Sequence, residues 1–372
     1  MERIAYVRSS NIYDDSRATK EIKALSKQGF FVEVFGWNRD GDASCECNNV
    51  FKNDENVRFH FYSCDAKRGI GIAGILKLLK WFFWLNREVR KFKDFSAVHF
   101  CNLDTTIGLI EWCKRRQIKI VYDIYDYYVD AHSIPSVLSN TIERIEINVI
   151  NNSDLVIICT EERRDQIKKA NPKKLIVIFN SPDIDEIPHV ELEYDYAYCG
   201  LLGAMRLIDE TLDEYKKYSD VKMIVAGYGI YASKAKTLDS EYENFHFLGS
   251  ISYSEVLKIE AKAKCLSAIY EPVIRNHRLC APNKFYESLA LGKPVIVCKD
   301  TGIDKIVEQY NIGIVINYDA HELYMAIKKL SSDSMLCSRY GLNARKLYES
   351  KYKWQLMQQR LIENYLELLD AF

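Results

Sequence analysis

The stretch Ala281-Pro-Asn-Lys-Phe-Tyr-Glu-Ser-Leu-Ala-Leu-Gly-Lys-Pro-Val-Ile-Val297 decides the fold of this chain. Pro282 suits the first turn of a helix, because its missing N–H and fixed φ cost nothing there. Gly292 can take the left-handed conformation that ends a helix, and Pro294 prevents continuation. The apolar residues 295–297 predict a short buried strand. The stretch therefore predicts a helix that leads into a parallel strand.

Three polar side chains share one sector near the start of this predicted helix, namely Asn283, Lys284 and Glu287. A helix start presents free N–H groups and partial positive charge, which suit a phosphate. A carboxylate one turn further along could accept hydrogen bonds from the hydroxyls of a ribose. An ordinary crossover helix with a charged edge is the alternative interpretation.

The length and composition indicate a globular protein with two domains. A chain of 372 residues is long enough for two hydrophobic cores. Its content of 48% hydrophobic and 28% charged residues is ordinary for globular proteins. The net charge of −1 argues against an extended basic surface, so we expect no nucleic-acid partner.

The cysteines and the absence of targeting segments indicate a cytoplasmic protein. Eleven cysteines are scattered along the chain, which is typical of a reducing compartment. No cluster of His and Cys has the spacing of a metal site. His99 and His132 stand alone and are interpreted as structural or loop residues. The chain enters an apolar strand at once, and no apolar run reaches the length of a membrane span.

The first half of the chain predicts a parallel sheet with crossover helices. A strand over 3–7, a helix over 16–28 capped by Ser16, and a strand over 30–37 form an opening βαβ unit. Residues 38–55 predict a polar loop. Further predicted strands cover residues 57–62, 97–101, 118–122, 154–160 and 175–179. The opening unit lacks the G-x-G-x-x-G fingerprint, which weighs against a nicotinamide enzyme.

Polar side chains follow two of these strands. Asn102 and Asp104 come directly after one strand, and Tyr125 and Asp126 come after the next. Ligands of open parallel sheets lie beyond the carboxyl ends of the strands. We therefore expect these four side chains to line a ligand site.

The second half contains three glycine turns at strand ends. A predicted strand ends in Gly200-x-x-Gly203, and Arg206 follows three residues later. Glycine lets a backbone approach a ligand closely, and arginine offers several N–H donors to a phosphate. Two more predicted strands end at Gly227 and Gly249. The repeated pattern indicates a second ligand-binding sheet.

The residues Pro282 to Glu287, followed by Leu289 to Ile296, resemble the nucleotide-sugar helix of family 4 glycosyltransferases with the GT-B fold. The opening loop around Asp15, the runs ending at Asp104 and Asp126, and the closing Tyr352-Lys353-Trp354 extend the resemblance along the chain. It implies an α/β protein with two doubly wound Rossmann-like domains facing across a cleft. We expect an acceptor-side domain over 1–185, a nucleotide-sugar domain over 186–350, and a helix over 351–372 that returns to the first domain.

The resemblance also implies the reaction. A retaining transferase of the bacterial surface-polysaccharide type would move a hexosyl or N-acetylhexosaminyl group from a UDP- or GDP-linked donor to a glycan or lipid-linked acceptor. No metal or other cofactor is expected, because the helix start and basic side chains would neutralise the leaving diphosphate. The catalytic candidates are Arg206, Lys284, Glu287 and Asp126. The donor-binding candidates are Gly200, Gly203, Gly227, Gly249, Asn276, Pro282 and Asn283. The acceptor-side candidates are Asp15, Arg17, Asn102, Asp104 and Tyr125.

Several positions depart from the family pattern. Tyr125 stands where relatives often carry a histidine, and Leu279 stands where many carry a glutamate that contacts the donor sugar. The lysine that usually accompanies Arg206 is missing, and Lys284 could complete the diphosphate clamp. Two alternatives therefore stay open: a nucleotide-sugar epimerase of similar architecture, and a non-catalytic subunit that binds a nucleotide sugar or a partner.

The segment 67–93 carries eight Lys or Arg and one acid around an aromatic middle. One face of its predicted helix contains Lys77, Lys80, Trp84, Arg87 and Lys91. A basic face with an interfacial tryptophan fits a helix that lies on an anionic membrane. We therefore expect peripheral contact with the inner face of the plasma membrane. A crossover helix with a solvated basic side is the alternative.

Overall fold

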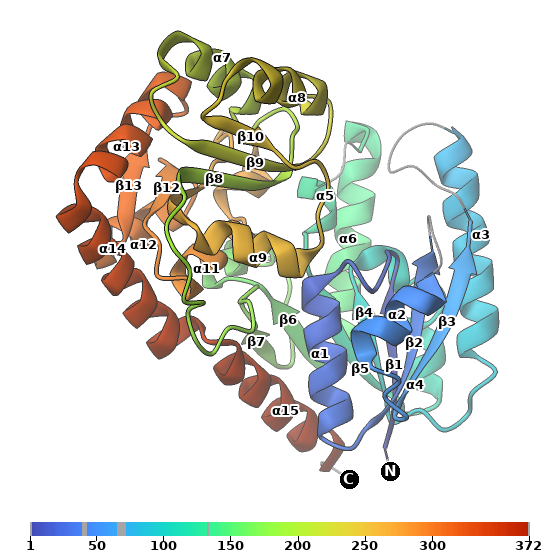
Figure 1. The fold of residues 1–372 in the computed structure, drawn as a ribbon. Helices are drawn as coiled ribbons and strands as arrows, with labels where there is room; N and C mark the ends of the chain where they lie inside the picture. The colour runs from blue at the N-terminus through green and yellow to red at the C-terminus, as the bar shows by residue number, and fades with distance from the viewer. Residues whose placement is uncertain (1, 39–42, 65–71, 132–133, 371–372) are drawn as a thin grey trace. The chain divides into compact units, whose positions relative to one another are not determined.

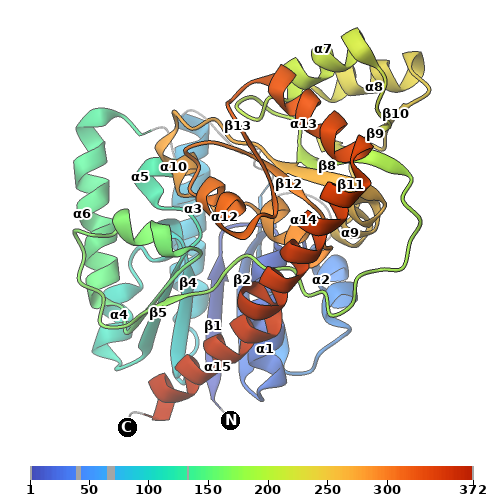
Figure 2. The same ribbon diagram turned by 90° about the vertical axis from the view of Figure 1, so that its left-hand side faces the viewer.

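The structure is a computed structural model that describes residues 2–38, 43–64, 72–131 and 134–370. The chain divides into two compact units. The first contains Met1–Phe179 and Met357–Phe372, and the second contains Asn180–Leu356. Each unit has its own parallel sheet with helices packed on it (Figure 1 and Figure 2). His132 lies outside the described residues.

The first unit contains a seven-stranded sheet in the order β3-β2-β1-β4-β5-β6-β7. Its strands are β1 (Arg3–Arg8), β2 (Phe31–Asn38), β3 (Val57–Ser63), β4 (Ala97–Cys101), β5 (Lys119–Ile124), β6 (Leu155–Ile158) and β7 (Leu175–Val177). Consecutive residues of β1 from Ile4 to Val7 are all fully buried. Such continuous burial is expected where helices cover both faces of a parallel sheet. The strand order reverses between β1 and β4.

Helices of different lengths connect these strands. They are α1 (Ser16–Lys27), α2 (Ala43–Phe51), α3 (Ile72–Val89), η1 (Leu103–Thr105), α4 (Ile110–Arg115), α5 (Tyr128–Ala131), α6 (Ser136–Asn152) and η2 (Glu161–Asp165). The predicted opening βαβ unit is confirmed, since β1 and β2 pair in parallel on either side of α1.

Two local predictions in this region are wrong. Asp15, not Ser16, caps α1, because its carboxylate accepts a hydrogen bond from the N–H of Ala18 at 3.1 Å. Within the predicted loop over 38–55, residues 43–51 form helix α2. Phe51 is buried and packs against Phe59 of β3 with ring centroids 5.1 Å apart. Tertiary burial of this aromatic end therefore supports a helix whose composition is polar.

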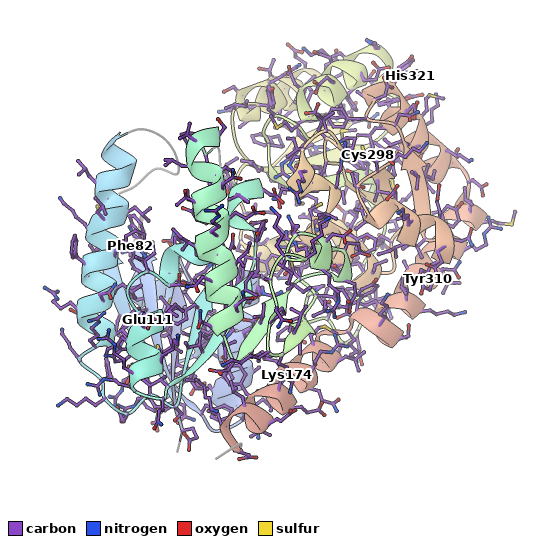
Figure 3. The ribbon with its side chains drawn as sticks, turned by 180° about the vertical axis from the view of Figure 1, so that it is seen from behind. Phe82, Glu111, Lys174, Cys298, Tyr310 and His321 are labelled. Atoms are coloured by element: carbon purple, nitrogen blue, oxygen red, sulfur yellow. The ribbon has the colours of Figure 1, made fainter. Side chains whose placement is uncertain are left out.

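The last turns of α15 (Trp354–Asp370) pack on the first unit. Tyr365 is fully buried, and its hydroxyl lies 2.7 Å from Nδ1 of His99 in β4. Near the end of the helix, Glu367 pairs with Lys174 at the surface, and Figure 3 shows Lys174 beside this helix. The helix thus joins the core of the first unit through an aromatic side chain from its inner face.

The second unit contains a six-stranded sheet in the order β10-β9-β8-β11-β12-β13. Its strands are β8 (Tyr194–Leu201), β9 (Met223–Tyr228), β10 (Phe245–Phe247), β11 (Ala263–Ala268), β12 (Val295–Cys298) and β13 (Gly313–Ile316). Its helices are α7 (Ile208–Tyr218), α8 (Ala232–Glu241), α9 (Tyr253–Ala261), α10 (Arg275–Arg278), α11 (Asn283–Ala290), α12 (Ile303–Tyr310), α13 (Ala320–Ser332), α14 (Ser334–Leu347) and η3 (Tyr348–Tyr352). Short β7 of the first unit and η3 of the second lie just beside the points where the chain passes between the units.

The helix and strand predicted from the opening stretch are confirmed as α11 and β12. Gly292 has φ of +62°, as a helix-ending glycine requires. A core cluster on one face of the sheet joins Tyr196 and Tyr198 of β8 to side chains of α7, α8 and α13. Helix α9 packs on β8 and β11, and α11 packs on β11 and β12. Since successive strand residues point to opposite faces, Cys199 is directed toward the side of α9 and α11.

Candidate functional site

The strand order of the second sheet reverses between β8 and β11, and this reversal places the candidate donor residues at one edge. In open α/β sheets, ligands bind where the strand order reverses, beyond the carboxyl ends of the strands. The segment after β8 contains Gly200, Gly203 and Arg206, and the segment after β11 leads through Asn276 into α11. The topology therefore gathers residues that are far apart in the sequence.

The ends of β8, β9 and β10 are held together by backbone hydrogen bonds. The N–H of Gly227 donates to the carbonyl of Gly249 at 2.7 Å, and the N–H of Leu202 donates to the carbonyl of Tyr228 at 2.7 Å. A Cβ atom added to Gly227 would overlap the carbonyl oxygen of Gly200. By contrast, no atom of the residues that the structure describes lies within 4 Å of a Cβ atom built on Gly249. Gly227 thus lets two strand ends approach closely, whereas open space adjoins Gly249.

Lys284 in the first turn of α11 lies directly over Gly200. A side chain at Gly200 would collide with its amino group. The Nζ atom also lies 4.9 Å from the ring centroid of Tyr198. Burial opposes the charge of Lys284, but Tyr198, Tyr270 and Glu287 together raise its pKa above the ordinary value. Lys284 is therefore a cation at neutral pH, positioned at the end of β8.

Arg206 provides a second cation at the same edge. Its guanidinium lies 4.6 Å from the ring centroid of Tyr270, which follows β11. Burial opposes its charge, and Tyr270 and Tyr198 raise its pKa. Both cations therefore lie over tyrosine rings at the ends of adjacent strands, an arrangement suited to an anion with several oxygens.

The loop that carries Arg206 has a strained backbone. Met205 and Leu207 have φ of +65° and +55°, a region that bulky side chains seldom occupy. The N–H of Glu271 donates to the carbonyl of Met205 at 3.1 Å, and the N–H of Leu207 donates to the hydroxyl of Tyr318 at 3.4 Å. Such strain persists only where neighbouring structure imposes it, and it is concentrated at functional sites.

The remaining donor candidates surround the start of α11. Pro282 is buried at the N-cap, Asn283 is exposed as the first helical residue, and Glu287 one turn later is buried. Asn276 lies half-buried in the short α10. Leu279 directly follows α10 and is half-buried. The structure brings these residues to one loop and helix, and their individual roles stay predictions.

In the first unit, Asn102 joins the ends of β4 and β5. It has φ of +68°, and its side-chain oxygen accepts hydrogen bonds from the N–H groups of Tyr125 at 2.9 Å and Asp126 at 3.2 Å. Asp126 also pairs with Arg163 at 3.1 Å and keeps about half of its side chain exposed. Asp104 lies half-buried in η1. Among these four, the carboxylate of Asp126 is the best placed to meet a ligand.

Tyr125 is enclosed by basic and phenolic side chains. The guanidinium of Arg8 lies 4.0 Å from its ring centroid, and its hydroxyl is 3.0 Å from the hydroxyl of Tyr6. Arg8 donates to Asp15 at 2.8 Å, and Asp15 is also the cap of α1. Burial raises the pKa of Tyr125 well above its usual range. Tyr125 is therefore neutral, and Arg8 was missed because a lone arginine after a strand carries no sequence signal.

Arg17 belongs to a buried ionic network. It is 6% exposed, and its Nε and Nη2 atoms each donate to Asp123 at 2.9 Å. It also pairs with Glu21 at 3.1 Å, and Tyr6 donates to Glu21 at 2.8 Å. Burial raises the pKa of Glu21 to about 7. This placement favours a supporting role for Arg17 behind the strand ends.

One group of side chains among the described residues has the proximity of a metal site. His99, Cys101 and Asp123 place potential ligand atoms within 4.8 Å of one another. Arg17 donates to both carboxylate oxygens of Asp123, and burial raises the pKa of the Cys101 thiol well above its usual range. A cation would have to displace a guanidinium and deprotonate a buried thiol, so the donor set does not fit a metal.

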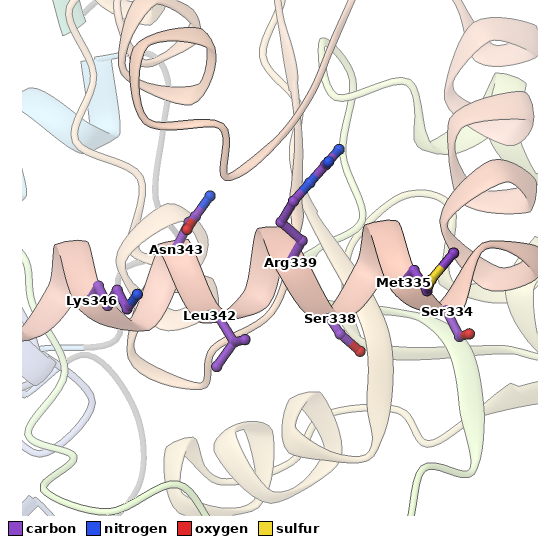
Figure 4. Close-up of a pocket in the computed structure, with 7 residues that line it drawn as sticks. All are labelled: Ser334, Met335, Ser338, Arg339, Leu342, Asn343 and Lys346. Carbon is purple, nitrogen blue, oxygen red and sulfur yellow. The ribbon is translucent and has the colours of Figure 1, made fainter.

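A separate hollow of about 440 Å³ lies along the surface of the second unit (Figure 4). All of its lining residues come from α14, and they include the exposed Met335 and Leu342. Within the described part of the chain, no other element contributes a side chain to it. This surface therefore lacks the converging polar groups of a binding site.

Two protein-family models match the chain. The model described as Glycosyltransferase Family 4 matches residues 17–186, and the model described as Glycosyl transferases group 1 matches residues 190–347. No curated protein gives a significant match.

Solved structures with the same fold cover nearly the whole chain at low sequence identity. Sucrose-phosphate synthase from Thermosynechococcus elongatus is 15% identical, with TM-score 0.70 and 100% of each chain covered. Anabaena Alr3699/HepE in complex with UDP-glucose is 14% identical, with TM-score 0.73 and 99% of this chain and 100% of the other covered. An S. aureus TarM variant in complex with Fondaparinux, alpha-GlcNAc-glycerol and UDP is 12% identical, with TM-score 0.67 and 100% of each chain covered.

The two parallel-sheet units and these matches define a protein of the GT-B class. Within that class, the chain belongs to the group 1 glycosyltransferases, with a family 4 region in its first half. The expected fold class and family are confirmed.

The close approach of Gly227 to Gly200 generates a stability prediction. Replacing Gly227 with Ala should lower the free energy of unfolding of the second unit by about 2 kcal/mol or more, because the new Cβ meets backbone. Gly249→Ala is the matched control and should cost about 1 kcal/mol, from its positive φ alone. Denaturant unfolding of both variants measures the difference. Equal losses would show that the two strand ends can separate without cost.

A second prediction concerns the buried network. Arg17→Met should destabilise the first unit by about 3–5 kcal/mol, because it leaves two buried carboxylates without their cation. Arg164→Met is the control, since Arg164 forms an exposed pair with Glu161 and should contribute only about 0–1 kcal/mol. Denaturant titrations of both variants, with hydrogen exchange of first-unit amides as the probe, give the two unfolding midpoints to be compared. A small effect at both sites would contradict a structural role for Arg17.

Proposed function

We propose that this protein is a retaining glycosyltransferase that uses a UDP- or GDP-linked hexose or N-acetylhexosamine. The acceptor is a glycan or a lipid-linked saccharide of a cell-surface polysaccharide. The observation that carries the proposal is the pair of cations, Arg206 and Lys284, at the point where the strand order reverses between β8 and β11. The UDP-glucose in the HepE structure and the UDP in the TarM structure support a nucleotide-sugar donor of this kind.

In the proposed reaction, the bond between the anomeric carbon and the diphosphate oxygen breaks, and a bond to an acceptor oxygen forms. The diphosphate leaves with the bonding electron pair. Arg206, Lys284 and the free N–H groups at the start of α11 stabilise the charge that develops on it. The acceptor hydroxyl attacks from the face that the diphosphate leaves, and its proton passes to a diphosphate oxygen. This proposal requires neither a metal nor a covalent nucleophile.

The carboxylate of Glu287 is proposed to accept hydrogen bonds from the donor ribose. It lies one turn beyond Lys284 on α11, so one helix would hold both the sugar and the phosphates of the nucleotide. The glycine-rich ends of β8, β9 and β10 leave room for the rest of the nucleotide, as the open space beside Gly249 illustrates. Together these features support the proposal that the second unit binds the donor.

The acceptor is assigned to the carboxyl edge of the first sheet. There, Asp126 holds a half-exposed carboxylate against Arg163, and Asp104 lies in η1, which follows β4. Asp15 and Asn102 support this edge through the cap of α1 and the β4–β5 connection. Tyr125, held by Arg8, gives the edge an aromatic surface in place of an imidazole.

Helix α3 supports the proposed membrane contact in a form that differs from the sequence prediction. Trp84 is half-buried and stacks on the buried Trp81 at 5.4 Å, so it is not the free interfacial aromatic that was expected. The exposed apolar side chains are instead Leu76 (55%), Leu79 (44%) and Phe83 (76%). None of the helices within the described residues has the length and apolar character needed to cross a bilayer.

These three apolar residues recur at helical spacing, and the exposed Lys80 and Arg87 lie beside them. An apolar stripe flanked by basic side chains matches a helix that inserts into the interface of an anionic membrane. We therefore propose peripheral attachment through α3 to the cytoplasmic face of the plasma membrane, where lipid-linked acceptors are available.

The donor assignment predicts that Arg206→Ala weakens the binding of UDP by tenfold or more, while uridine binding changes little. A hydrogen bond to a charged group contributes about 1.5–3 kcal/mol, and only the diphosphate offers that charge. Arg339→Ala is the matched control, because Arg339 also lies over a tyrosine ring but is exposed on α14. Calorimetry with UDP, GDP and uridine gives the affinities.

Transfer itself is tested with the nucleotide sugar of the better-bound base and a saccharide acceptor. NMR of the product should show the anomeric configuration of the donor. Conversion of the donor without an acceptor would indicate the epimerase, and nucleotide binding without any turnover would indicate a non-catalytic subunit. Equal loss of UDP and uridine binding in Arg206→Ala would contradict the diphosphate role.

The membrane proposal predicts flotation with vesicles that contain phosphatidylglycerol. The double variant Lys80→Glu, Arg87→Glu should reduce binding strongly, since each basic residue near an anionic surface contributes about 1 kcal/mol. Phe83→Ser should reduce vesicle binding at moderate salt as well, because it removes apolar area that would be buried in the membrane interface. Lys114→Glu with Arg115→Glu on α4 is the charge-matched control. If the wild-type protein does not bind these vesicles at low salt, the role of α3 is structural and the membrane proposal is wrong.

A further inference from the structure

Close to Lys284 lies a carboxyl group that the proposed function does not use. Glu260 is in the last turn of α9 and is 1% exposed. Its Oε2 atom is buried and has no hydrogen-bond partner among the described residues. An ionised carboxylate in such a position would be costly, because neither water nor a donor compensates its charge. The group therefore needs either a nearby cation or a proton.

The charged neighbours of Glu260 come from α11. Lys284 and Glu287 both act on its carboxyl group, one attracting negative charge and the other repelling it. From β8, the buried thiol of Cys199 faces the same three groups, and burial raises its pKa well above the usual range. Cys199 is thus a neutral neighbour. Among the described residues, the charged groups that act on Glu260 are thus one cation, Lys284, and one carboxyl group, Glu287.

Charge balance decides which group holds a proton. Lys284 can compensate one negative charge, and two carboxylates in one buried site do not both ionise readily. Glu260 is 1% exposed and Glu287 is 3% exposed, and among the described residues nothing donates to Oε2 of Glu260 a hydrogen bond that would stabilise an anion. Burial and the charge of Glu287 raise the pKa of Glu260 well above its usual range.

We infer that Glu260 is a positioning residue of the donor site, where its uncharged carboxyl group fills the buried side of the Lys284–Glu287 pair. Because it carries no charge, it leaves the amino group of Lys284 available to the diphosphate and the carboxylate of Glu287 available to the ribose. An ionised Glu260 would compete with the diphosphate for Lys284. This inference rests on the proposed function, and it adds a group on α9, a helix that contributes none of the donor-binding candidates.

The experiment is a pH series of UDP affinities, measured by calorimetry between pH 7 and 9.5. Glu260→Gln keeps the shape and stays neutral, so it should bind UDP at pH 7 within about threefold of wild type. As the pH rises, wild-type Glu260 loses its proton, and wild-type affinity should fall about fivefold or more relative to Glu260→Gln. The ratio of the two proteins cancels the titration of the nucleotide itself.

Two further variants sharpen the comparison. Glu260→Met removes the carboxyl group but keeps the length, and it should share the flat pH profile of Glu260→Gln because Oε2 has no partner to lose. Glu308→Gln removes an exposed carboxylate of α12 and should follow wild type at every pH. A flat pH profile in both neutral variants would show that the charge of residue 260, and not its shape, controls the UDP affinity.

The stability of the ligand-free protein provides an independent readout. A carboxyl group whose pKa is raised on folding contributes stability below its unfolded pKa and loses it as pH rises through the folded pKa. Wild type should therefore become less stable than Glu260→Gln as the pH increases, and the two should converge in acid. This readout does not depend on any nucleotide.

The outcomes separate the two proposals. If wild type binds neither UDP nor GDP, the proposed function is wrong, and the donor-site role of Glu260 is wrong with it. If wild type binds UDP but its pH profile matches that of Glu260→Gln, only the assignment of Glu260 is wrong. A tenfold loss of UDP affinity in Glu260→Gln at pH 7 would likewise overturn it, because it would show that an ionised Glu260 serves binding.

Discussion

The amino group of Lys284 occupies the space that a side chain at Gly200 would take, so a larger residue there would move the amino group away from the end of β8. The tyrosines on either side then support the two cations of the site. The placement of Lys284, and with it part of the proposed electrostatics of the leaving group, thus depends on one missing side chain.

The elements that local signals specify could be predicted from the sequence. Helix α11 and strand β12 are bounded by proline and glycine, and the strand ends at Gly200 and Gly227 are marked by the glycines themselves. Helix α2 could not be predicted, because its polar composition has no periodic signal and burial of Phe51 against the sheet stabilises it. Tertiary packing outweighed local propensity there.

The parts of the candidate sites that escaped prediction depend on contacts between distant residues. Arg17 and Asp123 are separated by 106 positions, and nothing in either neighbourhood reveals that they pair. Arg8 and Tyr125 meet only because the sheet order places β1 and β5 on either side of β4. Glu260 sits on an amphipathic helix in which an acid looks solvated. Topology, rather than composition, gives these residues their chemistry.

The division of the chain has a consequence for how the two units are joined. The chain passes from the first unit to the second after Phe179 and returns after Leu356, within α15. The N–H of Phe179 lies 3.3 Å from the sulfur of Met357, so the segment that leaves the first unit and the segment that returns to it are in contact at this point. Two segments of the chain therefore connect the units. Proteolytic cleavage of one segment would leave the units covalently joined through the other.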